Sequence, residues 1–160
     1  MGCQHEIAKK TVEKQAHYIV AVNNNQPGLT SAIESLFEAT DVGMQDRRLA
    51  QDITLDKDHG RLQTRRCVVA CDLSPMGRQV QAWPGLKSVV MVESTRELIN
   101  GREKGKSRTE WCYYISSLQL DAAEFNCQVR AHWAIENSCR WVMDMTFAED
   151  DCRVRAGDGA

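Results

Sequence analysis

The sequence predicts a single α/β domain, and three features along the chain lead to this fold class. A helix–strand–helix pattern opens the chain, three runs rich in β-branched residues follow in the middle, and a long helical pattern comes near the end. The 160 residues are enough for one domain with one buried core and too few for two ordinary domains. We therefore treat residues 1–160 as one domain.

The first part of the chain predicts a helix, a strand and a second helix. Apolar residues recur at helical spacing from Ile7, and the β-rich run 17–22 ends at three asparagines, as a buried strand would. A second apolar stripe at helical spacing runs from Leu29 to Phe37. This is half of an α/β unit, and the strand expected before its first helix is missing.

The middle of the chain predicts an antiparallel meander of three strands. Residues 40–58 are polar and aperiodic, so we expect a loop there. The β-branched runs 61–71, 86–95 and 108–117 follow, with turn-rich connections between them. The β-rich part therefore covers about residues 59–118.

A long helix is predicted from about residue 121 to about residue 147. Asp121 is placed to cap it, and Glu124 stands three residues later, as the reciprocal partner of a capping box does. Phe125, Val129 and Trp133 share one face of this helix.

Composition excludes several classes of protein. The net charge of -2 and the pI of about 6.1 argue against a generally basic nucleic-acid coat, although they allow a local basic patch. No apolar stretch is long enough to cross a bilayer, so we expect no membrane partner. The seven cysteines are odd in number and scattered, which favours reduced thiols in a cytoplasmic protein over a disulfide framework.

One candidate site lies on the predicted C-terminal helix. His132, Glu136 and Arg140 are spaced four apart, so they lie along one side of the helix. A carboxylate between two basic side chains could bind a hard cation while its neighbours reach phosphate oxygens. The alternative is a solvated helix face with a weak ion pair, and the spacing alone favours that alternative.

A second candidate site lies on the first predicted strand of the meander. Arg61 and Arg65 would share a face of that strand, with Gln63 between them. Two guanidinium groups on one exposed face could contact successive phosphates. An edge strand protected from aggregation by charge explains the pattern equally well, and both interpretations remain open here.

Short segments distributed along the chain carry a further signal. They include Tyr-Tyr-Ile-Ser-Ser-Leu at 113–118 and His-Trp-Ala-Ile-Glu-Asn at 132–137. The full set, in order, is 1–4 with 7–8, 18–29, 59–61 with Arg65, 83–86, 113–118, 132–137 and 147–155. In this order and spacing the segments resemble the DDE transposases of bacterial insertion sequences, in the branch of the H-repeat-associated proteins.

The resemblance implies a fold and an active site. The fold would be a partial ribonuclease-H-like fold with a β-rich antiparallel insertion before a long C-terminal helix. The active site would hold two Mg²⁺ or Mn²⁺ ions between two aspartates and one glutamate. Glu136 matches that glutamate, as catalytic residue and metal ligand. The supporting positions near it are His132, Asn137 and Arg140, and those expected on DNA are Arg61, Arg65 and Arg66.

The sequence also departs from the family pattern. Both catalytic aspartates of the family fall upstream of Met1, and Asn23, Gln63 and Arg140 stand where Lys, Glu and His are usual. One carboxylate cannot hold two divalent ions, so we expect the isolated chain to bind no metal and to be inactive. The resemblance implies the C-terminal portion of a transposase, with a frameshift or a wrongly assigned start codon as the cause.

The partners expected from this resemblance are DNA at the ends of an insertion sequence and a full-length transposase. A non-enzymatic DNA-binding or inhibitory fragment is the alternative function. An unrelated α/β scaffold, with Glu136 merely on its surface, is the third hypothesis.

Overall fold

The computed structural model describes residues 5–22, 26–41, 49–58, 60–102 and 104–132, and it has a mixed α/β architecture. The chain divides into a unit of residues 1–126 and a unit of residues 127–160. The elements are α1 His5–Glu13, β1 Ile19–Val22, α2 Pro27–Asp41, β2 Leu49–Asp58, β3 Arg61–Ala70, the 3-10 helix η1 Ser74–Met76, α3 Arg78–Ala82, β4 Ser88–Leu98 and β5 Ser107–Ser116.

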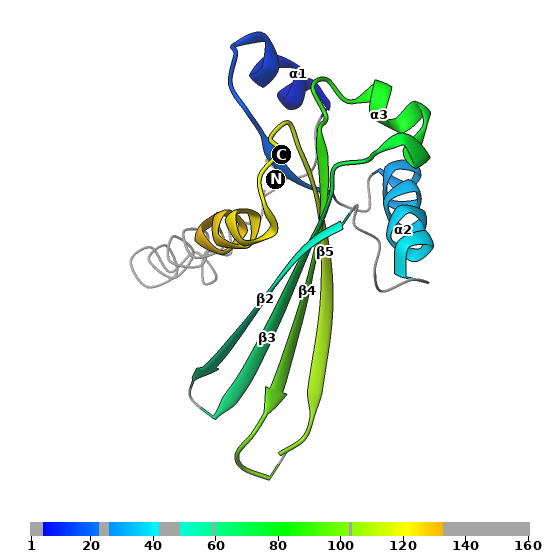
Figure 1. Ribbon diagram of the computed structural model, residues 1–160. Coiled ribbons are helices and arrows are strands. Elements are labelled where there is room, and N and C mark those ends of the chain that lie inside the picture. The colour runs from blue at the N-terminus through cyan, green and yellow to red at the C-terminus, as the bar shows by residue number, and fades with distance from the viewer. Residues whose placement is uncertain (1–4, 23–25, 42–48, 59, 103, 133–160) are drawn as a thin grey trace, which may run out of the picture. The chain divides into compact units, whose positions relative to one another are not determined.

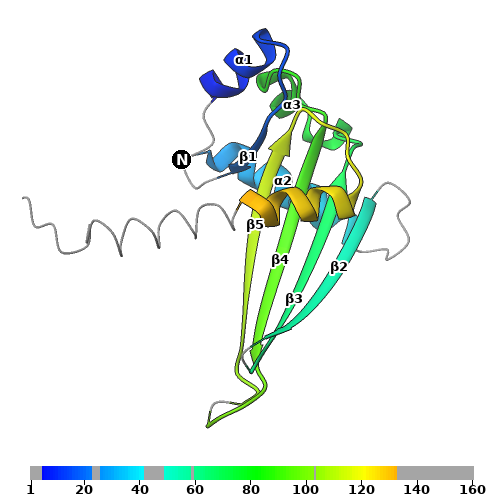
Figure 2. The same ribbon diagram turned by 90° about the vertical axis from the view of Figure 1, so that its left-hand side faces the viewer.

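The strands form one antiparallel sheet of five strands in the order β1-β5-β4-β3-β2 (Figure 2). The predicted meander is therefore confirmed, and each of its strands pairs with the next. β1 joins the sheet beside β5 and forms an edge, half-buried along its whole length. The prediction of a buried strand at 17–22 was thus wrong in its degree of burial.

The prediction of a loop over residues 40–58 is wrong for its second half. β2 occupies Leu49–Asp58 and pairs along its whole length with β3. Its sequence is mostly polar because it is an edge strand. Of its three large apolar side chains, Leu49 packs against the core, whereas Ile53 and Leu55 are exposed. This strand forms because its backbone pairs with β3. The pattern of hydrophobic residues does not indicate such pairing.

One face of the sheet is covered by helices, and we call it the α2 face. Val68, Val89 and Ile115 from three neighbouring strands are buried there in the same core as Leu29 and Ile33 of α2. The rings of Phe37 and Tyr113 stack across this layer with centroids 6.4 Å apart. Strand alternation therefore places the main core between the sheet and its helices.

The opposite face carries a second set of buried residues. Val69, Val90 and Tyr114 lie there, since they alternate with the residues of the α2 face.

The predicted capping box is confirmed, because the Glu124 backbone N–H donates to Asp121 Oδ1 at 2.7 Å and the Asp121 N–H donates to Glu124 Oε2 at 3.0 Å. Helical residues run from 122 to 132, and the rest of the predicted helix to 147 lies outside the described residues.

Buried hydroxyl groups hold β1 against β5. Ser116 Oγ donates to the carbonyl oxygen of Tyr18 at 2.9 Å, and the Tyr18 N–H donates to Ser117 Oγ at 3.0 Å. Ser116 and Ser117 are both buried, so these hydrogen bonds satisfy polar groups that water cannot reach.

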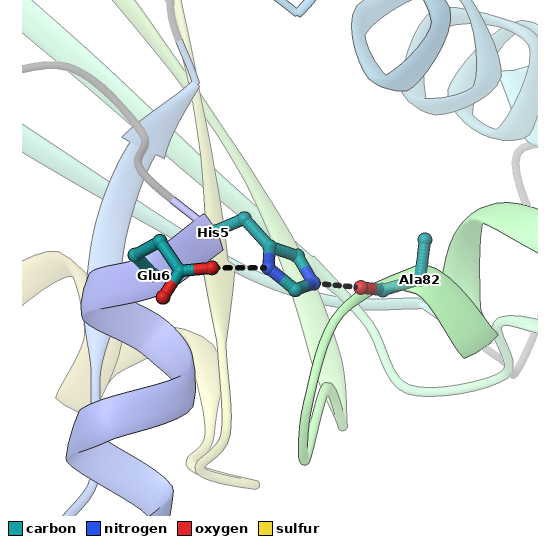
Figure 3. Close-up of polar contacts among 3 residues, drawn as sticks. All are labelled: His5, Glu6 and Ala82. Atoms are coloured by element: carbon teal, nitrogen blue, oxygen red, sulfur yellow. Dashed lines mark hydrogen bonds and ion pairs between the residues drawn. The ribbon is translucent and has the colours of Figure 1, made fainter.

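A side chain at the start of α1 contacts the end of α3 (Figure 3). His5 Nε2 donates to the carbonyl oxygen of Ala82 at 2.5 Å, and its ring lies 5.5 Å from that of Trp83. His5 Nδ1 lies 4.0 Å from Glu6 Oε1. These contacts attach α1 to the segment between η1 and β4.

The halves of β2–β5 farthest from the helices project beyond α1, α2 and α3 (Figures 1 and 2). We call this part of the sheet, residues 53–66 and 93–111, the arm. Gly60 directly precedes β3 and has a φ of +76°, a conformation that costs glycine least. The arm is where the strand arginines lie.

Candidate functional site

The candidate site on the C-terminal helix is described only at its first residue. His132 is exposed and is helical. Glu136, Asn137 and Arg140 lie outside the described residues, so their roles stay predictions.

The candidate site on the arm is described in full. Arg61 and Arg65 share one face of β3, as predicted, because Gln63 lies midway between them and alternate residues of a continuous strand point to the same side. Arg61 is exposed and Arg65 is half-buried. We call the arm surface that carries both side chains the arginine face.

Arg66 lies on the other side of the sheet from Arg65. It stands directly opposite Glu93 of β4, on the same side as Val68 and the α2 face. Its Nη1 atom lies 3.8 Å from Glu93 Oε2, and about a third of each side chain is exposed. Glu93 therefore partly balances the charge of Arg66 within the sheet. Arg66 also lies on the opposite side of the sheet from Arg61 and Arg65.

Arg65 reaches into a partly buried polar region. Among the described residues, its Nη1 atom is buried and has no hydrogen-bond partner. Burial, followed by the charge of Asp52, raises the pKa of Cys67 to about 12, and the Arg65 guanidinium opposes this rise. Arg65 thus brings a positive charge to the boundary between the covered and the projecting halves of the sheet.

Asn126 also contributes to this polar region, through a contact with Asp52. Its Nδ2 donates to Asp52 Oδ2 at 2.7 Å, while its Oδ1 is buried without a partner among the described residues. Asn126 itself is 3% exposed. This hydrogen bond therefore connects the first helical residues after Asp121 to the edge strand β2.

Two further arginines lie on the arginine face and were missed by sequence reasoning. Arg96 of β4 and Arg108 of β5 stand directly opposite each other, and Gln63 is the β3 neighbour of Arg96. Because Gln63 lies between Arg61 and Arg65 on their face, Arg96 and Arg108 share it. The charges were visible in the sequence, but the register that gathers them was not.

None of the described helices is long and apolar enough to span a membrane.

The sequence is similar over 100% of its length to two Escherichia coli proteins. It is 37% identical to "Putative transposase YncI" of strain O157:H7 and 34% identical to "H repeat-associated putative transposase YhhI" of strain K12. The chain is a relative of the H-repeat-associated transposases.

The chain spans 40% of the length of YncI and 42% of the length of YhhI. No protein-family model matches the chain. No solved structure matches it either. The predicted resemblance to the H-repeat-associated transposases is thus confirmed. Both relatives are more than twice as long as this chain.

Proposed function

We propose that this chain is the C-terminal portion of the catalytic domain of a DDE transposase. Its part in the chemistry is one carboxylate, that of Glu136, with His132, Asn137 and Arg140 beside it. The substrate is DNA at the ends of an insertion sequence. The observation that carries the proposal is the similarity of the whole chain to relatives named as transposases.

The proposed fold of the complete catalytic domain is ribonuclease-H-like, with the arm as its β-rich insertion. Two features support it. The strands β2–β5 follow one another between α2 and the C-terminal helical residues, as an insertion does. Among the described residues, β1 pairs with β5 alone, which leaves its other edge for the strand that the α/β pattern lacks.

The described residues alone do not fit a two-metal site. In residues 5–22, 26–41, 49–58, 60–102 and 104–132, no three His, Cys, Asp or Glu side chains converge as metal ligands. The proposed Mg²⁺ or Mn²⁺ site would combine Glu136 with the two aspartates that the family carries upstream. In-line attack on a phosphodiester needs both ions, so we propose that the isolated chain is inactive.

The decisive experiment restores the upstream segment. The chain is extended at its N-terminus with the family segment that carries both aspartates, and cleavage of DNA is measured with Mg²⁺, with Mn²⁺ and with a chelator. We expect metal-dependent cleavage that Glu136→Gln abolishes.

Glu124→Gln is the matched control, at a glutamate within the helical residues 122–132. Glutamine is tolerated as the reciprocal partner in a capping box, so this variant should cleave normally. Full cleavage by Glu136→Gln would remove Glu136 from the catalytic role. Cleavage by the 160-residue chain alone would show that its own residues form a complete site.

A non-enzymatic DNA-binding or inhibitory fragment is the second candidate function. The observation that favours it is the placement of Arg61 and Arg65 on one face of the arm. Such a fragment would bind DNA directly, or associate with a full-length transposase, without cleaving anything. Binding to DNA that weakens steeply as salt rises would support this function.

A further inference from the structure

The arginine face of the arm concentrates positive charge on its three inner strands. Successive rows across these strands contain Arg65, then Arg96 opposite Arg108, then Arg61. The rows are about 7 Å apart, which is the rise of two residues along a strand. The acidic residue among them is Glu110, and Asp52, Asp56 and Asp58 occupy positions on the same face along the edge strand β2, with Asp58 directly opposite Arg61 in the register. On this face the three inner strands therefore carry four arginines and one glutamate, and the edge strand β2 carries the aspartates.

The opposed pair Arg96 and Arg108 disfavours folding. Like charges directly across an antiparallel pair of strands repel each other. Glu110 Oε1 lies 2.9 Å from Arg108 Nη2, but the Arg108 side chain is 81% exposed and so gains little from this ion pair. Among the described residues, Arg96 is exposed and has no ion pair within 4.0 Å. Neither arginine contributes to the buried core, so structural stability does not explain the pair.

The chemistry of the four side chains matches phosphate oxygens. The guanidinium group is planar, keeps its charge at every physiological pH and donates two parallel hydrogen bonds to one phosphate. Four such groups in rows along a sheet can contact successive phosphates of one polymer, and three of them, Arg61, Arg96 and Arg108, are exposed. A polyanion with regularly repeated charges would also remove the repulsion between Arg96 and Arg108.

We propose that the arginine face binds the phosphodiester backbone of duplex DNA through Arg61, Arg65, Arg96 and Arg108, and that Arg66 on the α2 face takes no part. This inference rests on the proposed interaction of the chain with DNA. It adds Arg96 and Arg108 to the binding surface and assigns that surface to one side of the sheet. Contacts of this kind fix the position of DNA without selecting its sequence.

The test measures binding of the 160-residue chain to a fluorescent duplex of arbitrary sequence over a series of salt concentrations. Arg96→Gln/Arg108→Gln should weaken binding about tenfold or more at low salt. It should also lower the slope of log K against log salt by about 2, because two phosphate contacts are lost. The melting temperature should stay the same or rise, since the repulsion between the two side chains is removed.

Lys57→Gln/Arg66→Gln is the matched control. It removes the same charge from the same sheet, but both positions lie on the α2 face. We expect nearly unchanged affinity and slope. An equal loss of binding in both double variants would overturn the proposal, because it would show a general charge effect rather than one binding face.

A single variant keeps the test valid if the double variant unfolds. Arg108 is so exposed that Arg108→Gln leaves the core untouched, and this variant should lower the salt slope by about 1. An unchanged slope would contradict the proposal, as would a wild-type chain that fails to bind DNA at low salt. Neither result affects the transposase proposal, which stands or fails on metal-dependent cleavage by the extended chain and its loss in Glu136→Gln.

Discussion

At the scale of single residues, Cys67 shows how burial changes chemistry. It lies on β3 and is 0% exposed. Burial, and then the negative charge of Asp52, raise the pKa of its thiol to about 12, although Arg65 opposes the shift. The neutral thiol is therefore the form that the native state prefers, and Cys67 acts as a small core residue rather than as a nucleophile.

This shift predicts how stability depends on pH. The pKa of Cys67 rises from 9.0 in the unfolded chain to about 12 in the folded chain. The unfolded state therefore loses its proton first, and stability that is complete below pH 9.0 declines as pH rises toward 12. Thermal unfolding of the wild type and Cys67→Ala over this range should show a steeper decline in the wild type. Parallel curves would contradict the prediction.

Loss of the Asn126 side chain should disturb the polar region around Asp52. Asn126→Ala removes the 2.7 Å hydrogen bond to Asp52 and leaves that carboxylate without this donor. We expect the free energy of unfolding to fall by about 1–3 kcal/mol, measured by urea denaturation. Asp52→Ala should cost less in the Asn126→Ala background than alone. Additive losses would show that the two side chains do not interact.

At the scale of elements, the capping box of the C-terminal helix and the strand β2 contrast in how well the sequence foretold them. The capping box depends on residues three positions apart, so local sequence contains it whole. β2 depends on hydrogen bonds to β3, and most of its side chains are polar or exposed. Hydrophobic periodicity detects strands that bury one face, and it misses an edge strand that buries little.

The capping box gives a prediction for this helix. Asp121→Ala removes the acceptor for the Glu124 backbone N–H and should lower stability by about 1 kcal/mol, measured by thermal or urea unfolding. Asp121→Asn should recover most of the loss, because asparagine is an equally good N-cap. A loss as large in Asp121→Asn as in Asp121→Ala would show that the negative charge, not the hydrogen bond, matters.

At the scale of the whole molecule, the described sheet consists of two different halves. One half is covered by helices and contains fully buried side chains such as Val89 and Ile115. The other half is the arm, where Leu55 and Trp111 are more than half exposed. Local opening should therefore cost less free energy in the arm than in the covered half of the sheet.

The two halves should differ in amide hydrogen exchange. Residues 88–92 and 113–116 lie in the covered half of β4 and β5, and we expect their amides to exchange slowest. Residues 95–98 and 107–110 belong to the same strands in the arm and should exchange at least about tenfold faster, because fewer buried contacts resist local opening. Exchange measured by mass spectrometry or NMR at neutral pH tests this. Equal protection along both strands would indicate that the sheet opens as one unit.

Local sequence determined those parts of the protein that depend on near neighbours in the chain. The α1 and α2 helices, the three inner strands of the meander and the capping box at Asp121 were predicted from spacing and turn residues. Short segments in a fixed order also led to the transposase relatives. Each of these signals is carried by a run of residues that can be recognised without knowing what packs against it.

Only the tertiary structure decided what depends on partners distant in the chain. Pairing with β3 made a strand of residues 49–58, and the β4–β5 register set Arg96 against Arg108. The same alternation turned Arg66 toward Glu93 and away from Arg65. A change of one residue in register would move each arginine to the other face, and the hydrogen bonds that fix the register join strands from separate parts of the sequence.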